Sequence, residues 1–263
     1  MVTRALPRGA LPPRRDGQSR SAASGARGQP KATTSLTAAF DRALDSMSMV
    51  LQPILRASDL AVYGYEALLR TADPDLPHPG AMLEAAEKLR RIHVLSRRIR
   101  ALTADRFAAE KIDSRLLFVN LHAADFIDTS LAAGDSPLAP ISGRVVFEIT
   151  ERASLDEIPD IRARVAELRE MGYRIAIDDL GAGHSRSNLF RPLDTDFVKL
   201  DMSLVRGIEA SPSKRELVAT IVRSCEDRGI GVVGEGVETE EEAQTLIELG
   251  CDLLQGFYFG RPG

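Results

Sequence analysis

Eight short apolar runs recur along the chain, and each has the length of a buried β-strand. They cover residues 49–55, 61–68, 115–121, 144–149, 174–179, 196–201, 229–237 and 252–259. Helical patterns lie between most of these runs, and such alternation predicts a mainly parallel sheet. Eight strands favour an α/β fold of the TIM-like (β/α)8 barrel type. A doubly wound open sheet is the structural alternative.

The first two runs are separated only by residues 56–60. A parallel connection must cross the sheet and needs about a dozen residues or more. We therefore expect the first two strands to form an antiparallel hairpin, so that the barrel starts with one reversed strand.

Several helices carry boundary signals. They are expected over residues 37–47, 154–172, 211–229 and 238–250. Ser154 followed by Glu157 matches a capping pattern at the start of the second helix. Pro212 near the start of the third helix, and the glycines that end the last three, also fit helix boundaries.

The strand runs share polar residues at or near their ends, where an ordinary buried strand needs none. These residues are Glu66, Asn120, Glu148, Asp178, Asp179, Lys199, Glu235 and Gln255. In a barrel the carboxyl ends of the strands converge on one mouth, where active sites lie. Each residue taken alone is more simply a cap or a surface ion pair, but the joint pattern indicates a site.

The adjacent pair in "RIAIDDLGAG" poses a geometric question, because neighbouring residues of a strand point to opposite faces. Asp178 and Asp179 can serve one site only if the strand ends at about Asp178 and the backbone turns. Gly181 and Gly183 permit such a turn. A solvated loop that begins with an Asx turn is the simpler alternative.

A cluster of carboxylates in a dry cleft needs compensating protons or cations. Ligation by oxygen alone favours Mg²⁺ or Mn²⁺, and Ca²⁺ is also able to bind. Two ions about 3.5–4 Å apart, held by Asp178 and Asp179, would suit hydrolysis of a phosphodiester. Lys199 would orient water or neutralise developing charge. A barrel that uses Lys199 as a base on a metal-bound enolate is the alternative chemistry.

Charge and composition divide the chain. Residues 1–35 carry seven basic residues and one acid, and are rich in Pro, Gly, Ser and Ala, so we expect a disordered basic tail. A transit peptide is the alternative for this tail. Residues 36–263 form the expected barrel domain and are acidic. Two cysteines and the lack of a secretory signal indicate the cytoplasm, and no apolar run reaches the ~20 residues of a membrane span.

The four histidines carry little of this chemistry. His78 is expected in a loop, and His93 in a solvated part of a basic helix. His122 and His184 follow strand-end positions and are candidates to line the mouth. Cys225 and Cys251 are expected to be small core or near-surface residues.

The order of these motifs resembles the EAL-domain family, from about Met49 to Pro262. The matching segments are Glu-Ala-Leu at 66–68, Asn120, Glu-x-x-Glu at 148–151, Asp-Asp-x-Gly-x-Gly at 178–183, Lys199, Glu-Gly-Val-Glu-Thr at 235–239 and Gln-Gly at 255–256. The resemblance implies a barrel with an antiparallel first strand. It also implies metal-dependent opening of cyclic di-GMP to linear pGpG, or binding of cyclic di-GMP by a catalytically silent receptor.

The resemblance also implies residue roles. Glu66, Asn120, Glu148 and Asp178 would ligate one metal, Asp178 and Asp179 the second, and Lys199 and Glu235 would position the attacking water, with Glu235 a further ligand. Gln52, Arg70, Gln255 and Glu238 would contact the substrate or complete the inner site. Glu151 would stabilise the loop after Asp179, which couples dimerisation to metal binding.

The partners implied are cyclic di-GMP and a second copy of the chain in a homodimer, with Mg²⁺ or Mn²⁺ as cofactors and Ca²⁺ as an inhibitor. No DNA or RNA polymer is expected as a partner. The loop reads "DDLGAGHSR" where the family commonly has "DDFGTGYSS", so Leu180, Ala182, His184 and Arg186 depart from the pattern. These departures leave the receptor as the alternative to an enzyme. We expect no sensor or cyclase domain before the barrel and a short or absent closing helix.

Overall fold

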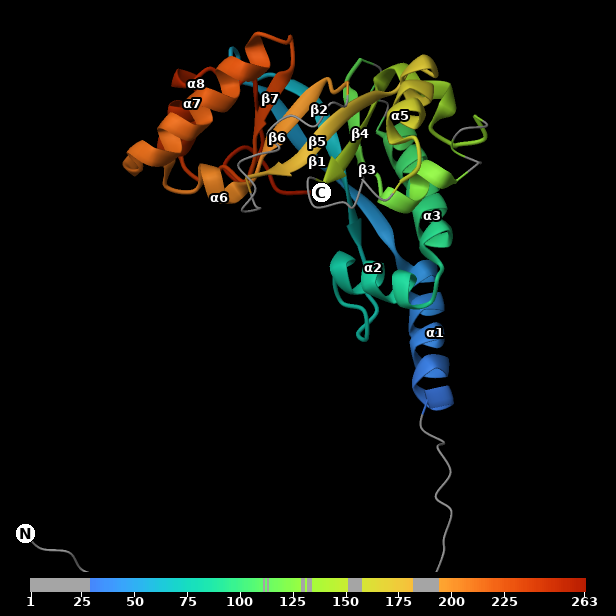
Figure 1. The fold of residues 1–263 in the computed structure, drawn as a ribbon. Helices are drawn as coiled ribbons and strands as arrows, with labels where there is room; N and C mark the ends of the chain where they lie inside the picture. The colour runs from blue at the N-terminus through green and yellow to red at the C-terminus, as the bar shows by residue number, and fades with distance from the viewer. Residues whose placement is uncertain are drawn as a thin grey trace, which may run out of the picture.

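Eight strands close into a barrel in their order along the chain (Figure 1). The computed structural model describes residues 29–110, 112, 114–128, 131, 134–150, 158–181 and 194–263. The strands are β1 (Ser48–Arg56), β2 (Val62–Arg70), β3 (Leu116–Asn120), β4 (Val145–Thr150), β5 (Arg174–Leu180), β6 (Phe197–Leu200), β7 (Gly231–Gly234) and β8 (Leu253–Leu254). All eight predicted strands are present, which confirms the (β/α)8-type barrel.

The first strand runs against the others. β1 pairs in antiparallel fashion with β2 on one side and with β8 on the other, whereas the remaining pairs are parallel. The hairpin expected from the short first connection is therefore confirmed. Its consequence is that residues at the start of β1, rather than at its end, lie at the mouth.

The last strand is shorter than its apolar run predicts. β8 contains only Leu253 and Leu254, although the run extends to residue 259. The chain turns at Gly256, where an added Cβ would lie 2.0 Å from the carbonyl oxygen of Val237. The apolar residues after this turn therefore lie beside the loop that follows β7 and do not extend the ladder.

An apolar layer fills the inside of the barrel. It consists of Ile54, Leu116, Phe118, Val146, Ala176, Phe197, Val233 and Leu253. Position 64 of β2 needs a glycine, because a Cβ there would lie 2.7 Å from the carbonyl oxygen of Leu116. Since side chains alternate along a strand, the next inward positions lie two residues further on.

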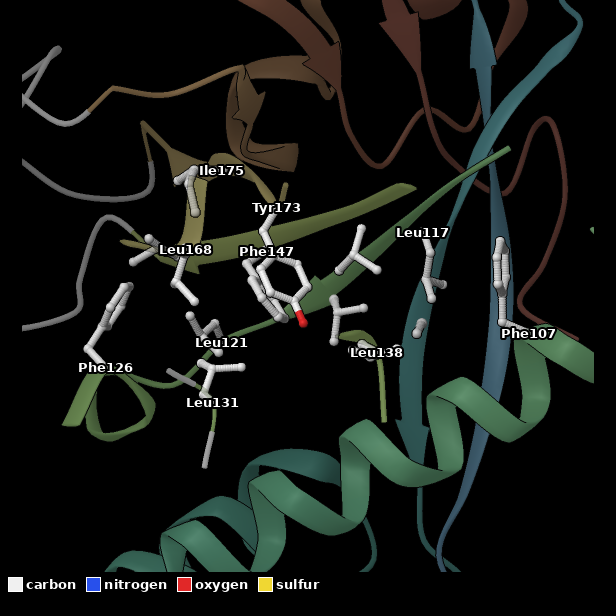
Figure 2. Close-up of a cluster of buried hydrophobic side chains, with 14 of the residues drawn as sticks. Phe107, Leu117, Leu121, Phe126, Leu131, Leu138, Phe147, Leu168, Tyr173 and Ile175 are labelled. Atoms are coloured by element: carbon white, nitrogen blue, oxygen red, sulfur yellow. The ribbon is translucent and has the colours of Figure 1, made fainter. Parts of the chain in front are cut away.

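Helices pack around the outside of the barrel and, for α2, beyond one end of it (Figure 1). They are α2 (Pro79–Lys88), α3 (Ile92–Ala109), α5 (Ile161–Glu170), α6 (Met202–Val205), α7 (Pro212–Glu226) and α8 (Glu240–Glu248), with the 3₁₀ helices η1 (Ala123–Ile127), η2 (Ala139–Arg144) and η4 (Ile208–Ala210). One buried cluster joins α3 and α5 to the first five strands, and its aromatic centre is Phe147 against Tyr173 (Figure 2). A second joins α6, α7 and α8 to β5–β8.

A long helix precedes the barrel. α1 (Gln29–Ser46) begins earlier than the helix expected over 37–47. It lies with α2 at the far end of the β1–β2 ribbon, away from the ring of strands (Figure 1). Phe40 of α1 and Met47, directly after this helix, pack with Met82 of α2 and with α3 in a third buried cluster. Residues 1–28 lie outside the described part of the chain, so the disordered tail stays a prediction.

The predicted start of the helix over 154–172 is wrong. α5 begins at Ile161, because Pro159 lies in a turn and Asp160 has a left-handed φ of 54°. Ser154 and Glu157 lie outside the described residues. The other predicted helices are confirmed as α7, with Pro212 in its first turn, and α8.

Both cysteines are free and buried, as expected. Among the residues described, no helix has the combined length and hydropathy of a membrane span.

Candidate functional site

A polar layer lies directly above the apolar layer inside the barrel. Each strand, or the residue directly after it, contributes one member, two positions nearer the mouth than the inward residue below it. These residues are Gln52, Glu66, Asn120, Glu148, Asp178, Lys199, Glu235 and Gln255. Seven of the eight were predicted as strand-end site residues, and Gln52, opposite Glu66 across the β1–β2 pair, was implied by the family resemblance. The barrel thus gathers the predicted set at one level of its mouth.

Lys199 lies at the centre of this layer. Its Nζ atom is 2.5 Å from Glu148 Oε1, 2.7 Å from Glu235 Oε1, 3.3 Å from Glu66 Oε2 and 3.5 Å from Asp178 Oδ1. Neither Lys199 nor Glu148 has any exposed side-chain surface. One ammonium group therefore faces four carboxylates that come from four different strands.

This arrangement shifts pKa values in directions that follow from burial and charge. Burial would lower the pKa of Lys199, but its four carboxylate neighbours, led by Glu148, outweigh burial and raise the pKa well above the ordinary value. Burial raises the pKa of Glu148, and the nearby charge of Glu66 raises it further. Burial also raises the pKa of Glu235 although Lys199 opposes the shift. The ammonium of Lys199 therefore stays charged, while Glu148 and Glu235 hold their protons to a higher pH than an exposed glutamate does.

Three amide side chains complete the layer. Asn120 Nδ2 donates to Glu66 Oε1 and Glu148 Oε2, each at 3.2 Å. Gln255 Nε2 donates to Glu66 Oε2 at 2.7 Å and to Gln52 Oε1 at 3.2 Å, and Gln52 in turn donates to the carbonyl of Gly260. Gln255 Oε1 is buried and has no hydrogen-bond partner among the described residues. It is an acceptor that suits a cation or a water donor.

A β-bulge answers the question raised by the adjacent aspartates. Between β5 and β6 the register passes from Ile177 opposite Val198 to Leu180 opposite Leu200, so β5 has one extra residue there. Asp179 adopts a left-handed φ of 60°, and its backbone N–H donates to Asp178 Oδ1 at 2.9 Å. A bulge redirects one side chain. As a result, oxygens of Asp178, Asp179 and Glu235 all lie within 4.8 Å of one another.

The donor set fits divalent cations. Five carboxylates and the amides of Asn120 and Gln255 converge, and a single lysine cannot balance five negative charges. Hard cations such as Mg²⁺, Mn²⁺ and Ca²⁺ prefer such oxygen ligands. The unpartnered Gln255 Oε1 supports the same conclusion.

Two predicted residues lie outside the polar layer, and a third falls outside the described residues. Arg70 is four residues beyond Glu66 on the same face of β2, but it is exposed at the rim and its guanidinium donates to the Leu69 carbonyl. Glu238 is exposed and pairs with Arg206, away from Lys199. Glu151, like His184 and most of the loop after Gly181, lies outside the described residues.

An ion-pair network below η1 was missed by the sequence reasoning. Arg100 is buried and pairs with Asp125 and Asp128, and Arg97 also pairs with Asp128. His93 lies in α3 as predicted, but it is half-buried beside these aspartates, with its Nδ1 buried, and so is only partly solvated. Two arginines already balance the two aspartates, which argues against a metal there. Arg97 and Arg100 are three residues apart, and so are Asp125 and Asp128. This matching spacing was the signal in the sequence that could have predicted the network.

Asp125 connects this network to the site. Its Oδ2 accepts the N–H of His122, and the His122 ring accepts the N–H of Ala124, so the two residues cap η1 directly after Asn120. A cavity of about 670 Å³ opens beside Asn120, between α3, η1 and the end of β4. His122 lines this cavity, in line with its predicted place at the mouth.

The fold and the site together define a class: a (β/α)8-type barrel with a reversed first strand and an acidic centre of oxygen ligands around one buried lysine. The chain belongs to the EAL domain family, whose match covers residues 35–262.

Relatives and solved structures agree with this family. The chain is similar to the cyclic di-GMP phosphodiesterase NbdA of Pseudomonas aeruginosa, at 31% identity over 83% of this chain and 29% of NbdA. It is 28% identical to the cyclic di-GMP phosphodiesterase PdeL of Escherichia coli, over 81% of this chain and 61% of PdeL. The chain thus spans less than two thirds of either relative.

The fold is also similar to that of Klebsiella pneumoniae BlrP1 in its complex with calcium and cyclic di-GMP. The TM-score is 0.73 at 33% identity, over 82% of this chain and 55% of that chain. BlrP1 has also been solved with manganese and cyclic di-GMP.

Proposed function

We propose that the chain hydrolyses cyclic di-GMP to linear pGpG with two divalent cations. The observation that carries this proposal is the single polar layer in which carboxylates from β2, β4, β5 and β7 surround Lys199. Similarity to NbdA and PdeL, and to BlrP1 in complex with cyclic di-GMP, supports the substrate.

The cation ligands follow from the geometry and the family resemblance. Glu66, Asn120, Glu148 and Asp178 would hold one cation. Asp178, Asp179 and Glu235 would hold the second, since their oxygens lie within 4.8 Å of one another. When bound, two such cations lower the pKa of water and stabilise charge on the phosphate and the leaving oxygen. Mg²⁺ or Mn²⁺ would support turnover, and Ca²⁺ would bind without supporting it.

Lys199 would act as a fixed positive charge. Its raised pKa keeps it protonated near neutral pH, so it donates hydrogen bonds that orient the attacking water and attract the anionic phosphate. The raised pKa favours this role over that of a base on a metal-bound enolate, because a general base must be unprotonated before it accepts a proton. Glu235, whose Oε1 is 2.7 Å from Lys199 Nζ and which is partly exposed, would accept the proton of the water.

The rim would bind the dinucleotide. Arg70, on the same face as Glu66 but nearer the solvent, is suited to a phosphate because its guanidinium can bind two oxygens at once. Gln52 and Gln255 would fix the inner edge of the substrate. The cavity of about 670 Å³ beside Asn120 has room for one nucleoside half of the dinucleotide.

An assay for turnover tests the proposal directly. The protein is incubated with cyclic di-GMP and Mg²⁺, Mn²⁺ or Ca²⁺, and linear pGpG is measured by chromatography. Product with Mg²⁺ or Mn²⁺ supports the enzyme. Binding in calorimetry without product identifies the silent receptor, which the altered loop after Asp179 favours as the second candidate.

Other expectations stay proposals. A homodimer in which Glu151 stabilises the loop after Asp179 rests on the family resemblance. Localisation in the cytoplasm rests on the two cysteines and the lack of a secretory signal. Ultracentrifugation with and without Mg²⁺ would measure the oligomeric state.

A further inference from the structure

A buried carboxylate ties together the two loops that follow Lys199 and Glu235. Glu242, in the first turn of α8, is 4% exposed. Its Oε1 accepts the N–H of Gly207 at 3.0 Å, and its Oε2 accepts the N–H groups of Glu238 at 2.8 Å and Thr239 at 3.3 Å. Gly207 follows β6 and α6, whereas Glu238 and Thr239 follow β7.

Arg206 reinforces the same junction. Its guanidinium pairs with Glu238 and lies 3.5 Å from Glu242 Oε2. Burial would raise the pKa of Glu242, but the N–H groups of Glu238 and Gly207, together with Arg206, outweigh burial and hold the pKa below its ordinary value. The carboxylate is therefore ionised, with each oxygen engaged.

The backbone between this junction and the site leaves little freedom. Glu235 N donates to the carbonyl of Leu200 at 3.2 Å, next to Lys199. Gly236 has a φ of 67°, and a Cβ there would lie 2.8 Å from that of Met202, at the start of α6. Only two residues, Gly236 and Val237, separate Glu235 from Glu238. A shift of the loop after β7 would consequently move the carboxylate of Glu235 relative to Lys199.

We propose that Glu242, with Arg206, is a positioning residue that fixes Glu235 against Lys199 by clamping the loop after β7 to the α6–η4 turn. The expected effect on turnover rests on the proposed function, but the effect on the position of Glu235 can be measured without it. Glu238 then serves the clamp through Arg206 and does not contact the substrate. Residues that support a metal ligand in this way typically alter metal affinity or activity about 10- to 100-fold when changed.

The test compares Glu242→Gln with Glu241→Gln. Both changes remove one negative charge from the first turn of α8, but Glu241 is exposed and has no part in the clamp. The glutamine at 242 keeps the size of the side chain, so its fold is checked by circular dichroism and thermal unfolding. We expect Mn²⁺ affinity, measured by calorimetry, and kcat for cyclic di-GMP to fall about tenfold or more in Glu242→Gln and to stay unchanged in Glu241→Gln.

Amide hydrogen exchange at Glu235, read without metal or substrate, separates the two hypotheses. Faster exchange in Glu242→Gln, and not in Glu241→Gln, supports the clamp even if the wild type shows no turnover, in which case only the proposed function fails. Wild-type exchange at Glu235 in a folded Glu242→Gln protein, with unchanged Mn²⁺ affinity, would overturn the clamp. Equal effects of both variants would also overturn it, because they would reflect only the charge at the helix start.

Discussion

Lys199 and Glu148 form an ion pair with 2.5 Å between Nζ and Oε1, and both side chains are fully buried. Removing one member of a buried pair leaves its partner uncompensated, which costs about 3–5 kcal/mol. We therefore expect Lys199→Met to lower the free energy of unfolding by about this amount in EDTA and to abolish turnover.

Added Mg²⁺ is expected to restore more stability to Lys199→Met than to the wild type, because the carboxylates that lose the ammonium attract cations more strongly. Urea unfolding with and without Mg²⁺ measures both effects. Lys88→Met is the control, since its pair with Glu84 is exposed and contributes about 0–1 kcal/mol. An equal gain from Mg²⁺ in wild type and Lys199→Met would contradict the prediction.

The bulge at Asp178–Asp179 makes a prediction about metal stoichiometry. Asp178→Ala removes a ligand shared between the two proposed cations, so turnover should be lost and calorimetry should detect fewer Mn²⁺ ions per chain. Asp179→Ala should remove the second cation alone. Asp75→Asn, which changes an exposed acid far from the layer, is the control. Near-normal turnover of Asp178→Ala would refute the two-cation assignment.

The raised pKa values of Glu148 and Glu235 predict how stability depends on pH without metal. A glutamate in the unfolded chain has a pKa of about 4.3. Above that pH the folded protein holds more protons than the unfolded chain, so its free energy of unfolding falls as pH rises towards the folded pKa values. The raised pKa of Lys199 adds stability that is lost only above about pH 10.4, and so leaves this window unchanged.

Glu148→Gln isolates this effect, because the amide does not titrate. We expect the wild type to lose stability relative to Glu148→Gln as the pH rises above the ordinary glutamate pKa of about 4.3, by about 1.4 kcal/mol for each unit by which folding raises the pKa. Urea unfolding in EDTA measures the difference. A difference that stays constant with pH would show that Glu148 titrates alike in both states.

The close approach of Gly256 to Val237 predicts a steric limit at the end of β8. Gly256→Ala should lower the free energy of unfolding by about 1–3 kcal/mol, as overpacking does. It should also reduce turnover, since Gln255 precedes it. Gly143→Ala is a matched control, because nothing lies within 4 Å of a Cβ there. Wild-type stability of Gly256→Ala would mean that the turn adjusts without strain.

Local patterns were sufficient to predict the eight strands and the polar layer, which depend on the alternation of apolar and polar residues. They also predicted the reversed first strand, which depends on the length of the first connection. The start of α5 was misjudged because a capping pattern at Ser154 competes with Pro159 five residues later. The bulge at Asp179 was not predicted, since it depends on how β5 pairs with β6. The pairing of Arg206 with Glu238 joins two loops that only the closed barrel brings together.

The apolar layer of Ile54, Phe118 and their neighbours closes the barrel on the side of the polar layer that faces away from the mouth. Water, cations and an anionic substrate would therefore reach the polar layer from the other side, through the mouth of the barrel. A segment that covers the mouth would control hydration, ion exchange and substrate entry together, because all three depend on the same side of the barrel.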